Sequence, residues 1–300
     1  MSRELPVWRS LLYVPVNVEK YVDKAHTRGA DVIQLDLEDS VPHSEKGHAR
    51  TLVELNAARV RRGGADVTVR INRPLSLAVR DLEYSIGPAV DGVALTKVDS
   101  ASHVRLLDEL VTEIEEKRGM PAGYTKFTTM IETADAFSRM DEIVRSSPRI
   151  VACSLGGEDF ALECNMQPTS EALLFPKQRM IIAANAAGVL PLGNIGSIAG
   201  FGDWEAFRKM VRHSRALGSM GAGCIHPMQV TIVNEEYTPT AEEVDYARQI
   251  VALNEEALKD GRASFSLDGK MIDVPIVVRA SKLIRRYEAI QAREARMLTG

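Results

Sequence analysis

The feature that most constrains this chain is a regular alternation between short apolar runs and longer amphipathic segments. Runs rich in β-branched and aliphatic residues are typical of buried strands, whereas apolar residues at every third or fourth position are typical of helices. Several of the helical segments end near a glycine, which commonly stops a helix. The strand-like runs are eight in number and occupy residues 9–15, 31–38, 66–72, 92–98, 127–133, 150–157, 188–197 and 223–227.

This alternation predicts an α/β fold with a parallel sheet covered by helices. Eight strand–helix units in about 230 residues fit a closed (β/α)8 TIM barrel. An open doubly wound sheet is the alternative, but no GxGxxG motif follows an early strand, and the glycine-rich segment 193–200 is late and irregular. We therefore predict a catalytic barrel over residues 1–238. Residues 239–300 are surplus to a barrel, and we expect them to form a C-terminal helical extension, either a lid or an arm that reaches a neighbouring subunit.

Composition narrows the possible partners. The 300 residues are 45% hydrophobic, enough for a sizeable core, and the net charge of −4 with 5% aromatic residues offers little for phosphate contacts or base stacking. No apolar run approaches the roughly 20 residues that span a bilayer, and residues 1–10 lack the apolar stretch of a secretory signal. We expect a cytoplasmic protein with neither a nucleic acid nor a membrane partner. The three cysteines contain no CxxC pair, so we expect neither a disulfide framework nor a zinc site.

Ionisable residues stand at the ends of five consecutive predicted strands, where a barrel carries its active site. Counted from Asp36, the steps between them are 34, 27, 35 and 27 residues, the size of successive strand–helix units. A single charged residue at a strand end often only caps the next helix, but five in succession indicate a shared site. These residues are Asp36 with Glu38 and Asp39, then Arg70, Lys97, Glu132, and Asp159 beside Glu158.

The residue types predict the chemistry. Glu132 and Asp159 follow neighbouring strands and offer only carboxylate oxygens, the ligands that Mg²⁺ prefers. Arg70 offers a planar guanidinium fork that matches a carboxylate. A keto or hydroxy acid fits between a metal and this arginine, an arrangement typical of a metal-dependent aldol or Claisen lyase.

Eight short motifs occur in a familiar order: RSLLYVP, DLEDSV, VRIN, TKV, MIET, GGEDFA, GCIHPMQV and GKMIDVP. Together they resemble the citrate lyase β-subunit-like branch of the HpcH/HpaI aldolase superfamily, from about residue 8 to about residue 280. The resemblance implies a TIM barrel that uses Mg²⁺ and is usually assembled as trimers. It also implies cleavage of β-hydroxyacyl thioesters, such as malyl-CoA, citramalyl-CoA or citryl groups on acyl carrier protein, to an α-keto acid and an acetyl thioester.

Carried over by position, the resemblance assigns roles to single residues. Glu132 and Asp159 resemble the metal ligands, Arg70 the arginine that binds the substrate carboxylate, and Asp273 the acid that a neighbouring subunit lends to the site. We expect a homotrimer or a dimer of trimers that binds an acyl-CoA or acyl-carrier substrate. The candidate catalytic residues are Asp273, Arg70, Glu38 and Asp39; the candidate substrate-binding residues are Arg70, Glu132, Lys97 and Asp36; and Tyr13, Asn17 and Lys20 resemble the segment that approaches the thioester arm.

Three alternatives stay open at this point. The chain could act on citryl-acyl carrier protein as the β subunit of a citrate lyase complex. It could be a free hydroxy-acid aldolase, although such relatives carry a histidine shortly after the second strand, where DLEDSVP stands here. It could also be a non-catalytic CoA-binding paralogue. The identity of the keto acid is open as well.

Overall fold

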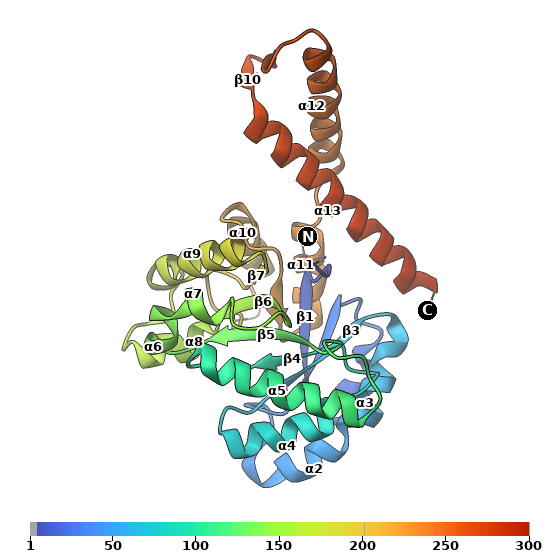
Figure 1. The fold of residues 1–300 in the computed structure, drawn as a ribbon, viewed down its shortest axis with the longest axis vertical. Coiled ribbons are helices and arrows are strands. Elements are labelled where there is room, and N and C mark those ends of the chain that lie inside the picture. Colours follow the sequence, from blue (N-terminus) through green and yellow to red (C-terminus); the bar gives the residue numbers. More distant parts are fainter. Residues whose placement is uncertain (1–4, 201, 300) are drawn as a thin grey trace. The chain divides into compact units, whose positions relative to one another are not determined.

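The computed structural model describes residues 5–200 and 202–299, so the first four residues of the predicted barrel, residue 201 and the last residue of the extension lie outside the described part. The chain divides into two compact units, Met1–Tyr237 and Thr238–Gly300. Figure 1 shows the ribbon of both.

The first unit is a (β/α)8 barrel (Figure 1). Its strands are parallel and follow the order β7-β6-β5-β4-β3-β2-β1-β8. A parallel bridge between Leu192 and Gly221, with a 2.7 Å hydrogen bond from the Gly193 N–H to the Gly221 carbonyl, joins β7 to β8 and completes the ring. The strands are β1 (Ser10–Pro15), β2 (Val32–Asp36), β3 (Asp66–Ile71), β4 (Gly92–Leu95), β5 (Lys126–Ile131), β6 (Ile150–Leu155), β7 (Leu190–Leu192) and β8 (Ala222–Cys224).

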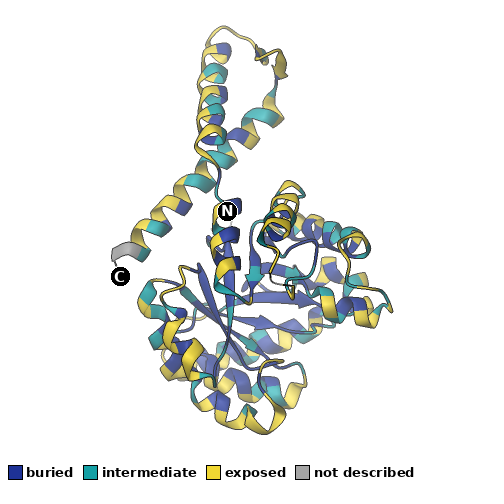
Figure 2. Cartoon of the chain, turned by 180° about the vertical axis from the view of Figure 1, so that it is seen from behind, coloured by how far each residue is buried: buried dark blue, intermediate teal, exposed yellow. Residues whose placement is uncertain are grey.

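Helices surround the ring, with buried inner and exposed outer faces (Figure 2). Short polar residues begin several of them: Ser100 Oγ accepts a hydrogen bond from the His103 N–H at the start of α5. No helix in the described part of the chain is both long and apolar enough to cross a membrane. The helices are α1 (Glu19–Ala25), α2 (Lys46–Thr51), α3 (Val53–Val60), α4 (Leu75–Ser85), α5 (Ala101–Lys117), α6 (Ala134–Ser138), α7 (Met140–Ile143), α8 (Gly157–Glu163), α9 (Ser170–Ala187), α10 (Trp204–Ala216) and α11 (Pro227–Tyr237), with 3-10 turns at His43–Glu45 and Arg61–Gly63.

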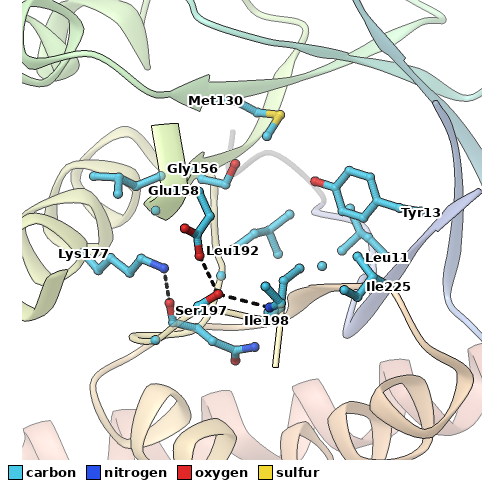
Figure 3. A pocket seen from close by; sticks show the side chains of 18 of the residues that line it. Leu11, Tyr13, Met130, Gly156, Glu158, Lys177, Leu192, Ser197, Ile198 and Ile225 are labelled. Atoms are coloured by element: carbon cyan, nitrogen blue, oxygen red, sulfur yellow. Dashed lines mark hydrogen bonds between the residues drawn. The ribbon is translucent and has the colours of Figure 1, made fainter. Parts of the chain in front are cut away.

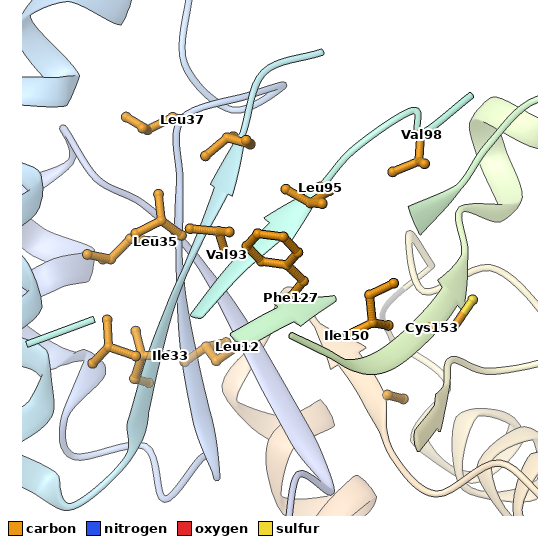
Figure 4. Packing of buried hydrophobic residues seen from close by; sticks show 14 of the residues in the cluster. Leu12, Ile33, Leu35, Leu37, Val93, Leu95, Val98, Phe127, Ile150 and Cys153 are labelled. Carbon is orange, nitrogen blue, oxygen red and sulfur yellow. The ribbon is translucent and has the colours of Figure 1, made fainter. Parts of the chain in front are cut away.

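Alternation along the strands separates the core from the barrel interior. In β2, Ile33 and Leu35 join the apolar core that the helices cover (Figure 4). Gln34 and Asp36 point the other way, into the barrel, because successive side chains of a strand face opposite sides. The register of β2 with β3 pairs Asp36 directly with Arg70. Strand register therefore places the first two charged residues of the predicted site side by side.

The second unit consists of two helices and a hairpin. Thr240 and Glu243 form a capping box at the start of its first helix. The polar stretch between the helices forms a two-stranded antiparallel hairpin. At its turn, Asp268 and Gly269 have φ of 49° and 73°, the left-handed pair that a two-residue hairpin turn requires. The elements are α12 (Ala241–Lys259), β9 (Phe265–Leu267), β10 (Lys270–Ile272) and α13 (Val274–Thr299).

Candidate active site

Charged side chains from five consecutive strand ends meet at the C-terminal mouth of the barrel. Asp36 is the last residue of β2, Arg70 lies near the end of β3, and Lys97 follows β4. Glu132 comes directly after β5, and Asp159 lies in the first turn of α8, after β6. Hydrogen bonds and ion pairs connect these five residues into one network.

The guanidinium of Arg70 is held by Asp36. Nε and Nη2 each lie 2.7 Å from an oxygen of Asp36, and Nη1 lies 2.9 Å from Glu38 Oε2 and 3.3 Å from Asp39 Oδ2. Burial alone would raise the pKa of Asp36 and lower the pKa of Arg70, but hydrogen bonds and opposite charge reverse both shifts. Both groups are therefore charged. Because Asp36 engages the Nε–Nη2 edge, the Nη1 side is the part directed toward the acidic loop.

Glu38 bridges the two cations of the site. Its Oε1 lies 2.6 Å from Lys97 Nζ, and its other oxygen faces Arg70. Burial raises the pKa of Glu38 although both cations oppose the shift. Burial alone would lower the pKa of Lys97, but the hydrogen bond to Glu38 raises it. The Lys97 ammonium also lies 3.4 Å from Asp159 Oδ1, so it links the acidic loop after β2 to the start of α8.

Glu132 is a deeply buried carboxylate of this network, with 2% of its surface exposed. Its Oε2 accepts a 2.6 Å hydrogen bond from the backbone N–H of Lys97. A β-carbon at Gly156 would lie only 2.6 Å from Oε1, so the carboxylate fits because that residue is glycine. Burial, together with the charges of Glu38 and Asp159, raises the pKa of Glu132 to about 8. This acid is therefore largely protonated at neutral pH unless a cation replaces the proton.

The donor atoms fit a hard cation. Among the described residues, no three His, Cys, Asp or Glu side chains form a metal-binding group, so Glu132 and Asp159 would be a two-carboxylate site. Mg²⁺ often binds proteins through one or two carboxylates and keeps several waters. Asp159 is 36% exposed, and its Oδ1 already lies beside the positive charge of Lys97. A pair of carboxylates, one of which needs nearby positive charge to ionise, suits Mg²⁺.

The other predicted site residues lie in different surroundings from one another. The Tyr13 ring centroid lies 5.0 Å from Cζ of Arg70, in cation–π contact. Asn17 follows β1, and its buried Oδ1 has no hydrogen-bond partner among the residues described. Lys20 is exposed on α1, with its ammonium 4.8 Å from the ring of the neighbouring tyrosine. Asp273 belongs to the second unit, where its carbonyl accepts hydrogen bonds from the first turn of α13.

Figure 3 shows a pocket of the barrel, whose volume is about 270 Å³. It lies beside the charged network. Tyr13 and Gly156 connect the two, because Tyr13 also contacts Arg70 and Gly156 also packs on Glu132. The strands that form its walls belong to the barrel, so the pocket opens within the barrel interior. Its apolar lining includes Leu11, Met130, Leu192, Ile198 and Ile225.

Sequence reasoning missed the polar end of this pocket. Lys177 lies there on α9, and Ser197 in the loop after β7 donates a 2.5 Å hydrogen bond to Glu158. One signal was present in the sequence: Lys177 lies four residues after Leu173 and three before Met180, on the buried stripe of α9. A lysine at a position where an amphipathic helix carries apolar residues indicates a special environment.

Comparisons with known proteins agree with this geometry. The HpcH/HpaI aldolase/citrate lyase family matches residues 9–227. The citrate lyase subunit beta of Leuconostoc mesenteroides subsp. cremoris is 31% identical, covering 94% of this chain and 93% of that protein. The L-malyl-CoA/beta-methylmalyl-CoA lyase of Cereibacter sphaeroides is 32% identical over 95% of this chain and 96% of that protein. A crystal structure of CitE from Mycobacterium tuberculosis with magnesium, acetoacetate and coenzyme A superposes with a TM-score of 0.75 at 26% identity, covering 94% of this chain and 98% of that one.

Proposed function

The chain belongs to the HpcH/HpaI aldolase/citrate lyase family, and from this premise we propose that it is a Mg²⁺-dependent carbon–carbon lyase acting on a β-hydroxyacyl thioester. The substrate is of the malyl-CoA or citramalyl-CoA type, and the products are an α-keto acid and acetyl-CoA. Support comes from the Cereibacter lyase, whose name states this kind of substrate, and from the CitE structure, which contains magnesium and coenzyme A.

One observation carries the proposal: at the mouth of the barrel a single network, linked through Glu38, joins a bidentate arginine and a lysine to the two carboxylates proposed for the metal. Arg70 binds the carboxylate of the substrate, and Asp36 fixes the plane of the guanidinium. Lys97 balances the acidic groups around it. Each of these residue types therefore has a role in binding a hydroxy acid or in its reaction.

Glu132 and Asp159 are the residues that would hold the metal. When bound there, Mg²⁺ supplies positive charge that polarises the hydroxyl and carboxylate oxygens of the substrate. A base removes the hydroxyl proton, the hydroxyl carbon becomes the ketone, and its bond to the α-carbon of the thioester breaks. The electron pair of that bond stays with the thioester as an enolate, which then takes up one proton to become the acetyl thioester.

Asp273 is the candidate for handling the enolate proton, as the acid in cleavage and as the base in condensation. In this proposal the chain assembles as a homotrimer or a dimer of trimers. The C-terminal unit then acts as a lid, and Asp273 completes the site of a neighbouring subunit. Its position between a β-hairpin and a long helix suits an acid presented on an arm.

A second candidate function is that of a β subunit in a citrate lyase complex, acting on a citryl group carried by acyl carrier protein. The relative from Leuconostoc, a citrate lyase subunit beta that matches nearly the whole chain, favours it. The chemistry of the barrel mouth would be the same in both cases, and only the carrier of the thioester would differ.

The proposal is tested by incubating the purified protein with Mg²⁺ and, separately, malyl-CoA and citramalyl-CoA while keto-acid release is followed. We expect release that EDTA abolishes and that Glu132→Gln lowers by at least about a hundredfold. Glu142→Gln, on an exposed glutamate of α7, is the matched control and should leave the rate unchanged. A free 4-hydroxy-2-oxo acid and citryl-acyl carrier protein serve as parallel substrates. Turnover of the carrier substrate alone favours the second candidate, turnover of the free hydroxy-oxo acid alone indicates an aldolase, and no turnover of any substrate contradicts the lyase.

A further inference from the structure

Lys177 is a buried lysine that the proposed mechanism does not use. It lies on the inner stripe of α9 and is 6% exposed. Its Nζ reaches the polar end of the pocket, where a β-carbon at Gly157 would lie 3.3 Å away. Figure 3 shows it opposite Tyr13 and Leu11, on the side that also carries Glu158.

The ammonium of Lys177 has no ionic partner within the described ranges. Its hydrogen bond goes to the backbone carbonyl of Asn194, and Glu158 influences it only through longer-range charge. Lysines are almost never fully buried unless they are paired, because removing a charge from water is costly. An ammonium that is nine-tenths buried and lacks an anion beside an open pocket points to an anionic ligand.

Glu158 does not cancel that charge. It is exposed to solvent and its carboxylate accepts a hydrogen bond from Ser197, so its field is screened by water. The charge of Lys177 lies in the protein interior and is screened much less. The positive group therefore dominates the inner end of the pocket.

The pocket has the size and the walls for a side chain. Its 270 Å³ is close to the roughly 300 Å³ at the small end of the range for ligand pockets. Leu11, Met130 and Leu192 give it apolar walls, and Gly156 and Tyr13 connect it to the carboxylates and the arginine of the charged network. The hydrogen of glyoxylate or the methyl group of pyruvate would leave most of this space to water.

We propose that Lys177 is a specificity-determining residue that binds a distal carboxylate, so that among thioesters of the malyl-CoA type this enzyme prefers those that release a dicarboxylic keto acid, with an aliphatic segment between its acid groups. The inference rests on the proposed function, because the reacting carboxylate is taken to bind at Arg70. One acid group of the ligand then lies in the charged network and the other beside Lys177. The apolar walls contact the carbons between them.

The test measures binding of matched keto acids, so it needs no thioester turnover. Isothermal titration, with and without Mg²⁺, compares 2-oxoglutarate with 2-oxopentanoate and oxaloacetate with 2-oxobutyrate. In each pair a carboxylate is replaced by a methyl group. We expect wild type to bind the dicarboxylic member at least about tenfold more tightly, as a charge-assisted hydrogen bond allows.

Lys177→Met keeps the length of the side chain and removes its charge. This variant should abolish the preference for the dicarboxylic acid while leaving the affinity for the monocarboxylic acids within about twofold of wild type. Lys177→Arg should keep part of the preference, because arginine retains the charge. Lys209→Met, on a 72% exposed lysine of α10, is the control and should change neither affinity.

Several outcomes would overturn the inference. One is that wild type binds the two acids of a pair with equal affinity. This result counts against the inference whether or not the variant folds. Equal weakening of both acids by Lys177→Met, with a lower melting temperature, would assign the lysine to anchoring Asn194 and not to the ligand. If the acids bind as expected but no thioester is cleaved, the proposed lyase function fails and the distal carboxylate site stands.

Discussion

The backbone N–H of Lys97 donates a 2.6 Å hydrogen bond to Oε2 of Glu132. Lys97 has φ of 45°, in the left-handed region that residues other than glycine seldom adopt. Its side chain meanwhile contacts Glu38 and Asp159. One strained residue therefore fixes the buried carboxylate through its backbone and balances two others through its ammonium. Such strain persists only where the surrounding contacts hold it, and it occurs often at functional sites.

The raised pKa of Glu132 predicts that magnesium binding depends on pH. Because the acid holds its proton up to a pKa of about 8, each bound ion must displace that proton. We expect the affinity for Mg²⁺ to rise about tenfold per pH unit between pH 6 and pH 8 and then to level off. Isothermal titration in buffers of different ionisation enthalpy measures both the affinity and the proton released.

The metal-free protein should show the opposite trend in stability. Between the ordinary pKa of a glutamic acid and about 8, the folded state keeps a proton that the unfolded state has released, so the free energy of unfolding falls as pH rises. Glu132→Gln should flatten this dependence in urea unfolding. An affinity for Mg²⁺ that does not vary with pH would contradict both expectations.

Gly156→Ala should disable the site without unfolding the barrel. The new β-carbon would lie 2.6 Å from Oε1 and 2.7 Å from Cγ of Glu132, so the carboxylate must move. We expect loss of keto-acid release by about a hundredfold or more and weaker Mg²⁺ binding. Gly47→Ala is the control, because nothing lies within 4 Å of its added carbon and alanine favours the surrounding helix α2. Equal activity of the two variants would show that Glu132 needs no such fit.

Asp36→Ala should lower both stability and activity. Asp36 is 1% exposed and is paired to a guanidinium that is 12% exposed, and breaking a buried pair costs about 3–5 kcal/mol. The loss in free energy of unfolding should lie at the lower end of this range, because Arg70 keeps its contact with Glu38. Urea unfolding measures the loss, and steady-state kinetics should show a raised KM for the thioester.

The matched control is Asp141→Ala. It removes a surface ion pair with Arg179, in which the aspartate side chain is 51% exposed and the arginine side chain is 34% exposed. Exposed pairs contribute about 0–1 kcal/mol, so the midpoint of unfolding should barely move. Equal losses in the two variants would remove the special role of the Arg70–Asp36 pair.

The proposed sharing of the site between subunits predicts complementation. Asp273→Ala and Glu132→Ala should each be inactive alone. If Asp273 serves the site of a neighbouring subunit, co-expression of the two variants should restore about a quarter of the wild-type activity, since one site in four combines both intact residues. Keto-acid release by the co-purified mixture measures this.

Two results would separate the possible explanations. Mg²⁺ binding that is retained by Asp273→Ala excludes a general loss of the site. No recovery in mixed assemblies that contain both variants, as verified by differential tagging, would place Asp273 in the site of its own chain or outside the reaction.

Much of the barrel was predictable from local patterns. The apolar runs reflect burial of each strand beneath helices, and each of the eight overlaps a strand of the structure. The pattern of apolar residues did not predict which residues of these strands face the barrel interior. Gln34 and Thr68 look like interruptions of apolar runs, yet they face each other across β2 and β3 inside the barrel, with Thr68 Oγ1 3.2 Å from Gln34 Oε1.

The sequence by itself determined which residues can carry the chemistry, because order and spacing along the strands bring Arg70, Lys97 and Glu132 to one rim. Only the tertiary structure decided how these groups share their charges. The pairing of Asp36 with Arg70 depends on strand register, and the enclosure of Glu132 depends on the backbone at Gly156, directly after β6. Both features are contacts between segments that are distant in sequence. Burial and Coulomb interactions act through space, so the charge state of a residue cannot be predicted from its neighbours along the chain. The same reason applies to Lys177, whose place beside the pocket arises from the packing of α9 against the barrel.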